Sequence, residues 1–172
     1  RDAGIPVHIF TGNHDLWMRD YLEQELGVKV IEDRLAFQCR DKQFFITHGD
    51  GKGPGDRKYK FLKMIFTNPV CRFLFKWLHP DIGIKIAQLW SGSNFTDPRI
   101  EKFMGEDREW LLQYAKAKIK DVKYDYLLMG HRHLPMDISL DGHSRYINLG
   151  DWIVNNTFAE FDGEYLRLIK FE

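Results

Sequence analysis

Three short segments of the sequence each join an apolar run to a polar cluster that contains glycine and histidine. Their sequences are VHIFTGNHD (7–15), QFFITHGDG (43–51) and YLLMGHRH (126–133). Because ligands of open α/β sheets bind beyond the carboxyl ends of the strands, these three ends are expected to converge on one site. Imidazole nitrogens with amide and carboxylate oxygens suit divalent ions such as Mn²⁺, Zn²⁺ or Fe²⁺. The candidate side chains are Asn13, His14, Asp15, His48, Asp50, His131 and His133.

The two histidines of GHRH are separated by one residue. Side chains in such positions, on a chain that leaves a strand, can point to the same side and grip two ions about 3.5–4 Å apart. His131 and His133 could then each hold a different ion. Gly12, Gly49 and Gly130 would let the backbone turn sharply and approach the site.

The composition is that of a chain that folds as one compact domain. Of 172 residues, 44% are apolar and 29% are charged, which is ordinary for a domain with a buried core. The 25 Lys and Arg balance the 25 Asp and Glu, so we expect no nucleic-acid partner. Cys39 and Cys71 form no Cys-x-x-Cys pair, which argues against a disulfide or a zinc knuckle. No apolar run approaches the roughly 20 residues that span a bilayer, and no segment resembles a signal peptide, so the chain is expected to be soluble and not exported.

The order of the predicted elements is that of an α/β fold. Strand-like runs cover 7–10, 35–39, 43–47 and 126–129, and a further cluster follows residue 134. A helical pattern lies within 15–26, and Gly27 marks its end. Asp141-Gly142 and Asp162-Gly163 each separate β-branched and aromatic runs, which is the signal for a tight hairpin. We therefore expect a layered α/β sandwich that ends in antiparallel strands.

The middle of the chain, from Gly51 to Lys123, has little period-two alternation and is expected to be a helical insertion. Capping residues precede three helical patterns: Asp56, Asn68 with Pro69, and Asp97 with Pro98. The second of these helices is apolar almost all round, whereas a surface helix needs an apolar stripe of only about 100°. It either lies buried in the insertion's own core, or it forms an apolar groove or membrane-facing surface rimmed by cations.

The three polar clusters resemble a known set of motifs. GNHD, HGD and GHRH, in this order and each after a strand, resemble the later three motifs of the calcineurin-like metallophosphoesterases. More closely, the chain resembles the UDP-2,3-diacylglucosamine hydrolases of lipid A biosynthesis, on the insertion with its IAQLWSGSNF (86–95) and on LGDW (149–152). The resemblance implies a layered α/β/β/α metallophosphoesterase sandwich, with a core from 1–50 and 124–172 and a helical cap from 51–123.

The same resemblance implies a metal-dependent enzyme. It would hydrolyse the diphosphate of UDP-2,3-diacylglucosamine to a lipid monophosphate and UMP, at a centre of two divalent ions. The ions are expected to be Mn²⁺, with Zn²⁺, Fe²⁺ or Mg²⁺ as alternatives. A nucleotide-linked glycolipid substrate further implies a cytoplasmic protein that docks peripherally on the inner membrane through its cap. The sequence does not indicate an oligomeric state.

Roles for single residues follow from the resemblance. Asn13 and His48 would bind one ion together with His131, and His133 would bind the other ion. His14 would lie beside the attacked phosphorus as a cation or proton donor, and Asp15 would hold it there. Asp50 would brace its loop instead of binding metal. Contacts with the substrate would come from Asp56, Arg72, Lys76, Trp90, Ser91 and Asn94, although Asp56 can equally be a helix N-cap.

The sequence departs from the family's pattern ahead of GNHD. The family also has an Asp-x-His and a Gly-Asp-x-x-Asp, whose second Asp bridges the two ions, and neither precedes residue 12. The only Asp-x-His, at 141–143, lies in a predicted hairpin. The chain is therefore expected to be the carboxy-terminal part of a phosphoesterase without its first βαβ portion. It would hold half of the metal cage and be weakly active or inactive by itself, because no bridging carboxylate offsets the repulsion between the ions.

Two other functions stay open at this stage. The first is a calcineurin-like phosphodiesterase or phosphatase that acts on a soluble substrate. The second is a non-catalytic scaffold that keeps the metallophosphoesterase fold without its metals. The clustered histidines argue against the scaffold, since a scaffold has no need of grouped metal ligands.

Overall fold

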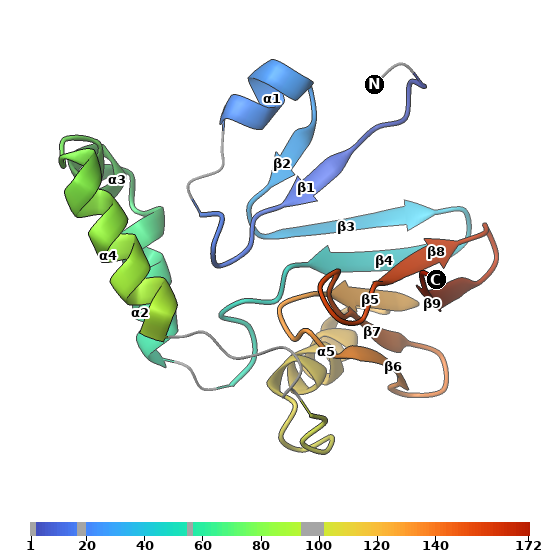
Figure 1. Ribbon diagram of the computed structural model, residues 1–172. Helices are drawn as coiled ribbons and strands as arrows, with labels where there is room; N and C mark the ends of the chain where they lie inside the picture. Colours follow the sequence, from blue (N-terminus) through green and yellow to red (C-terminus); the bar gives the residue numbers. More distant parts are fainter. Residues whose placement is uncertain (1–2, 17–19, 55–56, 94–101) are drawn as a thin grey trace.

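The computed structural model describes residues 3–16, 20–54, 57–93 and 102–172, which form a mixed α/β structure around a five-stranded sheet (Figure 1). The sheet has the strand order β3-β4-β5-β7-β6. Its strands are β3 (Arg34–Cys39), β4 (Lys42–Thr47), β5 (Tyr126–Met129), β6 (Pro135–Ser139) and β7 (Arg145–Leu149). Strands β4, β5 and β7 are parallel, whereas β3 and β6 pair antiparallel at the two edges. The predicted α/β class is confirmed.

Two further pairs of strands lie outside this sheet. β1 (His8–Phe10) pairs in parallel with β2 (Lys29–Ile31), and helix α1 (Asp20–Leu26) lies between them in the chain. The helix predicted within 15–26 is therefore shorter in the described residues, because Asp15 belongs to a turn in which its N–H donates to the Gly12 carbonyl (3.1 Å). β8 (Thr157–Phe161) and β9 (Leu166–Lys170) form an antiparallel hairpin.

Both hairpins predicted from Asp-Gly pairs are present. One joins β6 to β7 and the other joins β8 to β9. In the first turn the Asp141 carboxylate accepts the backbone N–H groups of His143 (3.0 Å) and Ser144 (2.6 Å). The Asp162 carboxylate does the same for Glu164 (2.9 Å) and Tyr165 (2.8 Å). Each carboxylate therefore satisfies donors of its own turn, which is why a local pattern was enough to predict it.

The central sheet is covered on both faces, because successive side chains of a strand point to opposite sides. One core lies between the sheet and helix α5 (Trp110–Asp121), and the other lies between the sheet and the β8–β9 hairpin. The first core contains Phe45, Leu111, Leu112, Ala115, Leu127, Met129, Met136 and Tyr146. The second contains Phe44, Tyr126, Leu128, Ile147 and Leu166. The helix, the sheet and the hairpin are thus stacked as three layers, in agreement with the predicted sandwich.

Helix α5 lies within the range 51–123 that the sequence assigned to an insertion. Its buried side chains are part of the sheet core, so its packing places it with the core. The helix start predicted at Asp97 and Pro98 lies outside the described residues, and within the described part of the chain α5 begins at Trp110. Residues 102–109 are not helical, because Gly105 adopts a φ of 92° and the Glu109 carboxylate accepts the N–H of Met104.

Helices α2 (Arg57–Thr67), α3 (Pro69–Lys76) and α4 (Pro80–Ser93) form a separate group, the cap, which stands beside the sheets (Figure 1). The predicted start of α3 is confirmed, since the Asn68 side chain accepts the N–H groups of Val70 (2.8 Å) and Cys71 (3.2 Å). The start of α4 at Pro80 was not among the predicted helix starts. Large apolar side chains of the cap are exposed, so α3 is not a helix buried in the insertion's own core.

A pair of Leu→Ala variants tests this division between core and cap. Leu112 is fully buried (0% exposed) under the sheet, whereas Leu74 on α3 is 60% exposed. We expect Leu112→Ala to lower the free energy of unfolding by about 2–5 kcal/mol, because it leaves a cavity in the core. Leu74→Ala should change it by about 0.5 kcal/mol or less. Urea denaturation of both variants measures the difference, and equal losses would contradict the assignment of α5 to the core.

Candidate functional site

Three strand ends meet at one edge of the structure, as the sequence predicts. Asn13 follows β1, His48 follows β4 and His131 follows β5. Because β4 and β5 are parallel and pair Thr47 with Met129, the chain leaves both strands at the same level. The Gly130 N–H then donates to the His48 carbonyl (3.0 Å). The ring centroids of His48 and His131 are 5.5 Å apart.

The donor set fits a divalent ion at this point. Nε2 of His48 and Oδ1 of Asn13 are 3.3 Å apart. Two donors that each lie about 2.0–2.2 Å from one ion are separated by roughly 3.0–3.5 Å, so these atoms are spaced as ligands of a single ion. Burial lowers the pKa of His48, and the neighbouring Asp50 carboxylate only partly opposes this effect. His48 is therefore kept in the neutral form that metal binding requires.

Gly12 gives the His48 ring its space. A Cβ atom at Gly12 would lie 2.9 Å from both Cε1 and Nε2 of that ring. A side chain at this position would have to displace the imidazole from its place beside the loop that carries Asn13. The glycine of GNHD is thus explained by the close approach of two strand ends.

The GHRH segment makes an unusually tight turn. His131 has a φ of 65°, and the Arg132 N–H donates to the Gly130 carbonyl (2.7 Å) across it. A non-glycine residue in this conformation costs about 1–3 kcal/mol and persists where surrounding contacts impose it. One such contact comes from Asn148, whose Nδ2 donates to the same Gly130 carbonyl (2.7 Å). The turn directs the His131 ring toward His48.

His133 is held by a different loop. Nδ2 of Asn155 donates to the His133 carbonyl (2.7 Å) and to Oδ2 of Asp151 (2.7 Å). Asp151 in turn orders its loop by accepting the N–H groups of Ile153 (2.7 Å) and Val154 (2.6 Å). Nδ1 of His133 is buried and has no hydrogen-bond partner among the residues that the structure describes. A buried polar atom without a partner asks for an explanation, and the role of His133 toward metal stays a prediction.

Not every predicted residue joins this cluster. His14 is exposed, and in the described part of the chain no hydrogen bond or ion pair joins it to Asp15, so the expected support of His14 by Asp15 is absent. Within the described ranges, no three His, Cys, Asp or Glu side chains lie close enough to hold one ion. The ligands brought together here are two imidazoles and one amide.

The relatives of this sequence decide its family. A comparison with protein-family models found no match. UDP-2,3-diacylglucosamine hydrolase of Porphyromonas gingivalis (strain ATCC BAA-308 / W83) is 33% identical over 185 residues, which cover 99% of this chain and 71% of that protein. This chain belongs to the UDP-2,3-diacylglucosamine hydrolase family. The enzyme of the same name from Xanthomonas oryzae pv. oryzae (strain PXO99A) is 23% identical, over 99% of this chain and 72% of that protein.

Solved structures show a weaker likeness. An archaeal phosphodiesterase superposes with a TM-score of 0.44 and 16% identity, covering 96% of this chain and 69% of that chain. The family assignment rests on the sequence relatives. The enzyme class predicted from GNHD, HGD and GHRH, a hydrolase of the metallophosphoesterase type, is confirmed by them.

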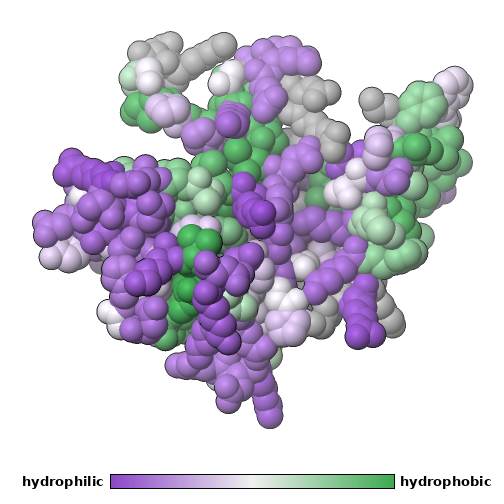
Figure 2. All heavy atoms as spheres, turned by 180° about the vertical axis from the view of Figure 1, so that it is seen from behind, coloured by the Kyte–Doolittle hydropathy of each residue, from purple (hydrophilic) through white to green (hydrophobic). Residues whose placement is uncertain are grey.

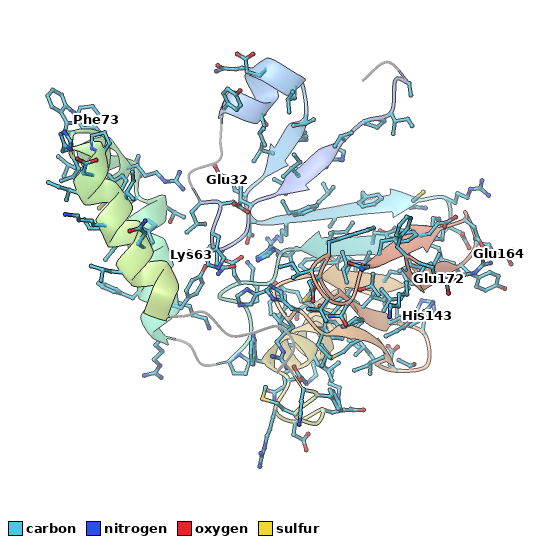
Figure 3. All side chains as sticks on the ribbon, in the orientation of Figure 1. Glu32, Lys63, Phe73, His143, Glu164 and Glu172 are labelled. Atoms are coloured by element: carbon cyan, nitrogen blue, oxygen red, sulfur yellow. The ribbon has the colours of Figure 1, made fainter. Side chains whose placement is uncertain are left out.

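In this member of the UDP-2,3-diacylglucosamine hydrolase family, Asp50 connects the loop that carries His48 to the cap. Its carboxylate is buried and accepts Nζ of Lys63 (2.6 Å) and the hydroxyl of Tyr59 (2.6 Å), both on α2. Burial alone would raise the pKa of Asp50, but the hydrogen bonds from Lys63 and Tyr59 outweigh it and hold the pKa below the ordinary value. Figure 3 shows Lys63 on the side of the cap that faces the sheets, and Phe73 at the far end. The predicted role of Asp50 as a brace agrees with these contacts.

A second connection runs from the cap to the GNHD loop. Nη2 of Arg72 donates to the Leu16 carbonyl (2.8 Å), and its Nε donates to the Phe66 carbonyl (2.5 Å). Arg72 was predicted to bind substrate, yet these bonds give its guanidinium a part in joining α3 to the core. Both loops that carry a predicted ligand of the first ion, 11–16 and 48–54, are thus tied to the cap.

The side chains of the other residues predicted to contact substrate lie outside the described part of the structure. Asp56 and Asn94 lie outside the described residues. Lys76 ends α3, and Trp90 and Ser91 belong to α4, but their side chains are outside the described part as well. Their substrate contacts stay predictions.

Several residues that shape the site were missed by reading the sequence. They are Tyr59, Glu109, Arg132, Asn148 and Asn155. None forms a local motif with the residue it supports, except Arg132, which stands between the two histidines. Only for Asn155 did the sequence offer a hint, in the LGDW segment of the resemblance. Asp151 of this segment orders the loop that contains Asn155.

Substitution of Gly12 tests the packing of the His48 ring. We expect Gly12→Ala to displace the imidazole and to weaken Mn²⁺ binding at least tenfold, because the new methyl group occupies the place of the ring. The fold should survive, since Gly12 has no positive φ. Titration with Mn²⁺ followed by electron paramagnetic resonance measures the affinity. Gly83→Ala, within α4 and away from the site, is the control, and an unchanged affinity of Gly12→Ala would contradict this account.

The Asp50 connection makes stability depend on pH. Because the pKa of Asp50 is lowered by folding, its contribution is present above about pH 4 and is lost as the pH falls through the lowered value. We expect Asp50→Asn to lower the free energy of unfolding by about 2 kcal/mol at pH 7 and to flatten its decline under acid conditions. Urea denaturation at a series of pH values measures both effects. The exposed Asp41→Asn serves as control, and parallel pH profiles for wild type and Asp50→Asn would refute the prediction.

Proposed function

We propose that this protein hydrolyses the diphosphate of UDP-2,3-diacylglucosamine and releases a lipid monophosphate and UMP. The observation that carries the proposal is the convergence of Asn13, His48 and His131 at one edge of the structure, in a chain whose relative of that name is 33% identical. The arrangement of the donors suits one divalent ion, and His133 adds a buried imidazole for a second. Mn²⁺ is our choice of ion, because imidazole and amide or carboxylate oxygen suit a borderline to hard cation.

The chain's own residues divide the work at the site. When bound, the divalent ions would supply charge neutralisation for the phosphoryl oxygens and activate water for attack. Asn13, His48 and His131 would hold an ion in one place. The tight turn at His131 sets the direction of its ring in advance. His14 is exposed beside Asn13 and is available to a substrate, so it can stabilise charge on the leaving group. A well-placed acid or cation of this kind contributes about 10²–10⁴-fold to the rate.

The activity is tested with UDP-2,3-diacylglucosamine and added Mn²⁺ over prolonged incubation. We expect slow release of UMP that depends on Mn²⁺ and is abolished in His48→Ala. His14→Ala should lower turnover by about 10²-fold or more and leave the bound metal unchanged, because His14 is not among the clustered ligands. Release of UDP in place of UMP, or undiminished turnover in His48→Ala, would contradict the proposal.

The exposed apolar surface of the cap is proposed to bind the acyl chains and to dock on the inner membrane. Figure 2 shows hydrophobic side chains gathered over the cap at the right of the view. Trp77 is 79% exposed and Leu89 is 78% exposed, and Phe73 and Phe75 are exposed with them. Surfaces of this kind mark sites of protein or membrane interaction. No helix in the described residues has the length and apolar character to cross a bilayer.

We further propose that the reaction takes place on the cytoplasmic side of that membrane, as expected for a nucleotide-linked substrate. Cys39 and Cys71 are both free thiols, which agrees with a reducing compartment. The exposed Lys85 on α4 adds a cation next to the apolar surface, where it could meet anionic headgroups.

Vesicle flotation tests the membrane contact. We expect the wild-type chain to float with anionic phospholipid vesicles and the double variant Trp77→Ser, Leu89→Ser to lose most of this binding, because apolar area drives insertion. Trp152→Ser is the matched control, since Trp152 is 61% exposed but lies outside the cap. Equal flotation of all three proteins would rule out the cap as the contact. Failure of the wild type to float, together with hydrolysis of soluble phosphodiesters, would favour a soluble substrate.

A further inference from the structure

We infer that the buried ion pair between Glu109 and Arg132 is a positioning element that holds the GHRH turn in the shape in which His131 meets His48. Only the metal-binding part of this inference rests on the proposed function. The shape of the turn can be measured without metal.

The pair connects the site to the start of helix α5. Nε of Arg132 donates to Oε2 of Glu109 (3.1 Å), and Nη2 of Arg132 donates to Oε1 (3.1 Å). This two-point geometry fixes the plane of the guanidinium as well as its distance. The guanidinium also lies 5.2 Å above the centre of the Trp110 ring. Arg132 therefore has one available orientation, and its backbone forms the end of the turn at His131.

Both charges are removed from water. Glu109 is 0% exposed and Arg132 is 7% exposed. A buried ion pair of this kind often adds little to stability compared with apolar side chains of the same volume, so we assign its role to the arrangement that it imposes. Glu109 also stands at the N-cap position of α5 without capping the helix through its side chain. Its carboxylate is used for Arg132 and for the Met104 N–H (3.1 Å) instead.

The pair acts where the backbone is strained. The residue before Arg132 is His131, with its φ of 65°, and the residue after it is His133. The Gly130 carbonyl is held from one side by Asn148 and from the other by the Arg132 N–H. Nη2 of Arg132 further donates to the Lys102 carbonyl (3.0 Å). Arg132 lies between His131 and His133, so holding Arg132 in place also holds the turn that carries both imidazoles.

A merely stabilising role and a positioning role predict different results. If the pair only stabilises the fold, replacing both residues by apolar side chains restores stability and leaves the site intact. If it positions the turn, the same replacement keeps the fold and still releases His131. The double variant Glu109→Leu, Arg132→Met separates the two, because it leaves no single charge buried without a partner.

Three variants are compared with the wild type: Glu109→Gln, Arg132→Lys and the double variant. The matched control is Glu106→Gln, which removes an exposed partner of Lys116 close to the same helix. The metal-free readout is the nuclear Overhauser contact between the rings of His48 and His131, with the long-range ¹H–¹⁵N spectrum of the histidines. The second readout is the affinity for Mn²⁺ alone, measured by electron paramagnetic resonance at a temperature at which each protein is folded.

We expect the ring contact to weaken or vanish in Glu109→Gln and in the double variant, and to persist in Glu106→Gln. Mn²⁺ affinity should fall by about 10–100-fold in the first two, as for other residues that orient metal ligands, and less in Arg132→Lys. Retention of the ring contact in a folded double variant would overturn the inference, even if Glu109→Gln failed to fold. A wild type that binds no Mn²⁺ would refute the metal site of the proposed function, while the ring contact would still decide the inference.

Discussion

The pairing of two parallel strands determines the geometry of the site. Strands β4 and β5 align Thr47 with Met129, so that His48 and Gly130 leave the sheet at the same level and are joined by a backbone hydrogen bond. A shift of this register by one residue would turn every side chain of a strand to the opposite face. It would place Phe45 and Leu127 outside the core under α5 and carry His48 away from His131. The same alternation that buries the core therefore sets the distance between the ligands.

The rest of the structure holds the GHRH turn at this edge of the sheet in a backbone conformation that is intrinsically unfavourable. The turn at His131 is strained, and it is restrained by Asn148 and, in our inference, by Glu109 and Arg132. Asn148 lies on β7, which is a strand of the sheet, and Glu109 stands at the start of α5, which packs on the sheet. A site on such rigid elements can hold ligands within the narrow tolerance that a metal ion demands. The core and the chemistry are thus connected through a few buried polar contacts.

The cap has a different relation to the site. It is attached through polar contacts, Lys63 and Tyr59 to Asp50 and Arg72 to the Leu16 carbonyl, while its large apolar side chains stay exposed. An ordinary monomeric domain would bury such residues. The arrangement suits a protein that binds an apolar ligand on its surface and positions the polar part of that ligand at a polar site. This is the physical basis on which the lipid substrate is proposed.

Features that depend on neighbours in the chain could be predicted from the sequence alone. The strands of 43–47 and 126–129, the Asn68 cap and the two Asp-Gly hairpins follow from local periodicity and local hydrogen bonds, and the grouping of Asn13, His48 and His131 follows from the rule for parallel strand ends. The tertiary structure alone decided that α5 belongs to the core, that Arg72 joins the cap to the GNHD loop, and that Glu109 pairs with Arg132. Partners such as Glu109 and Arg132 are 23 residues apart and form no motif. Their contact exists only once the sheet has brought α5 beneath the GHRH turn, because a buried charge is tolerated only where folding supplies its partner.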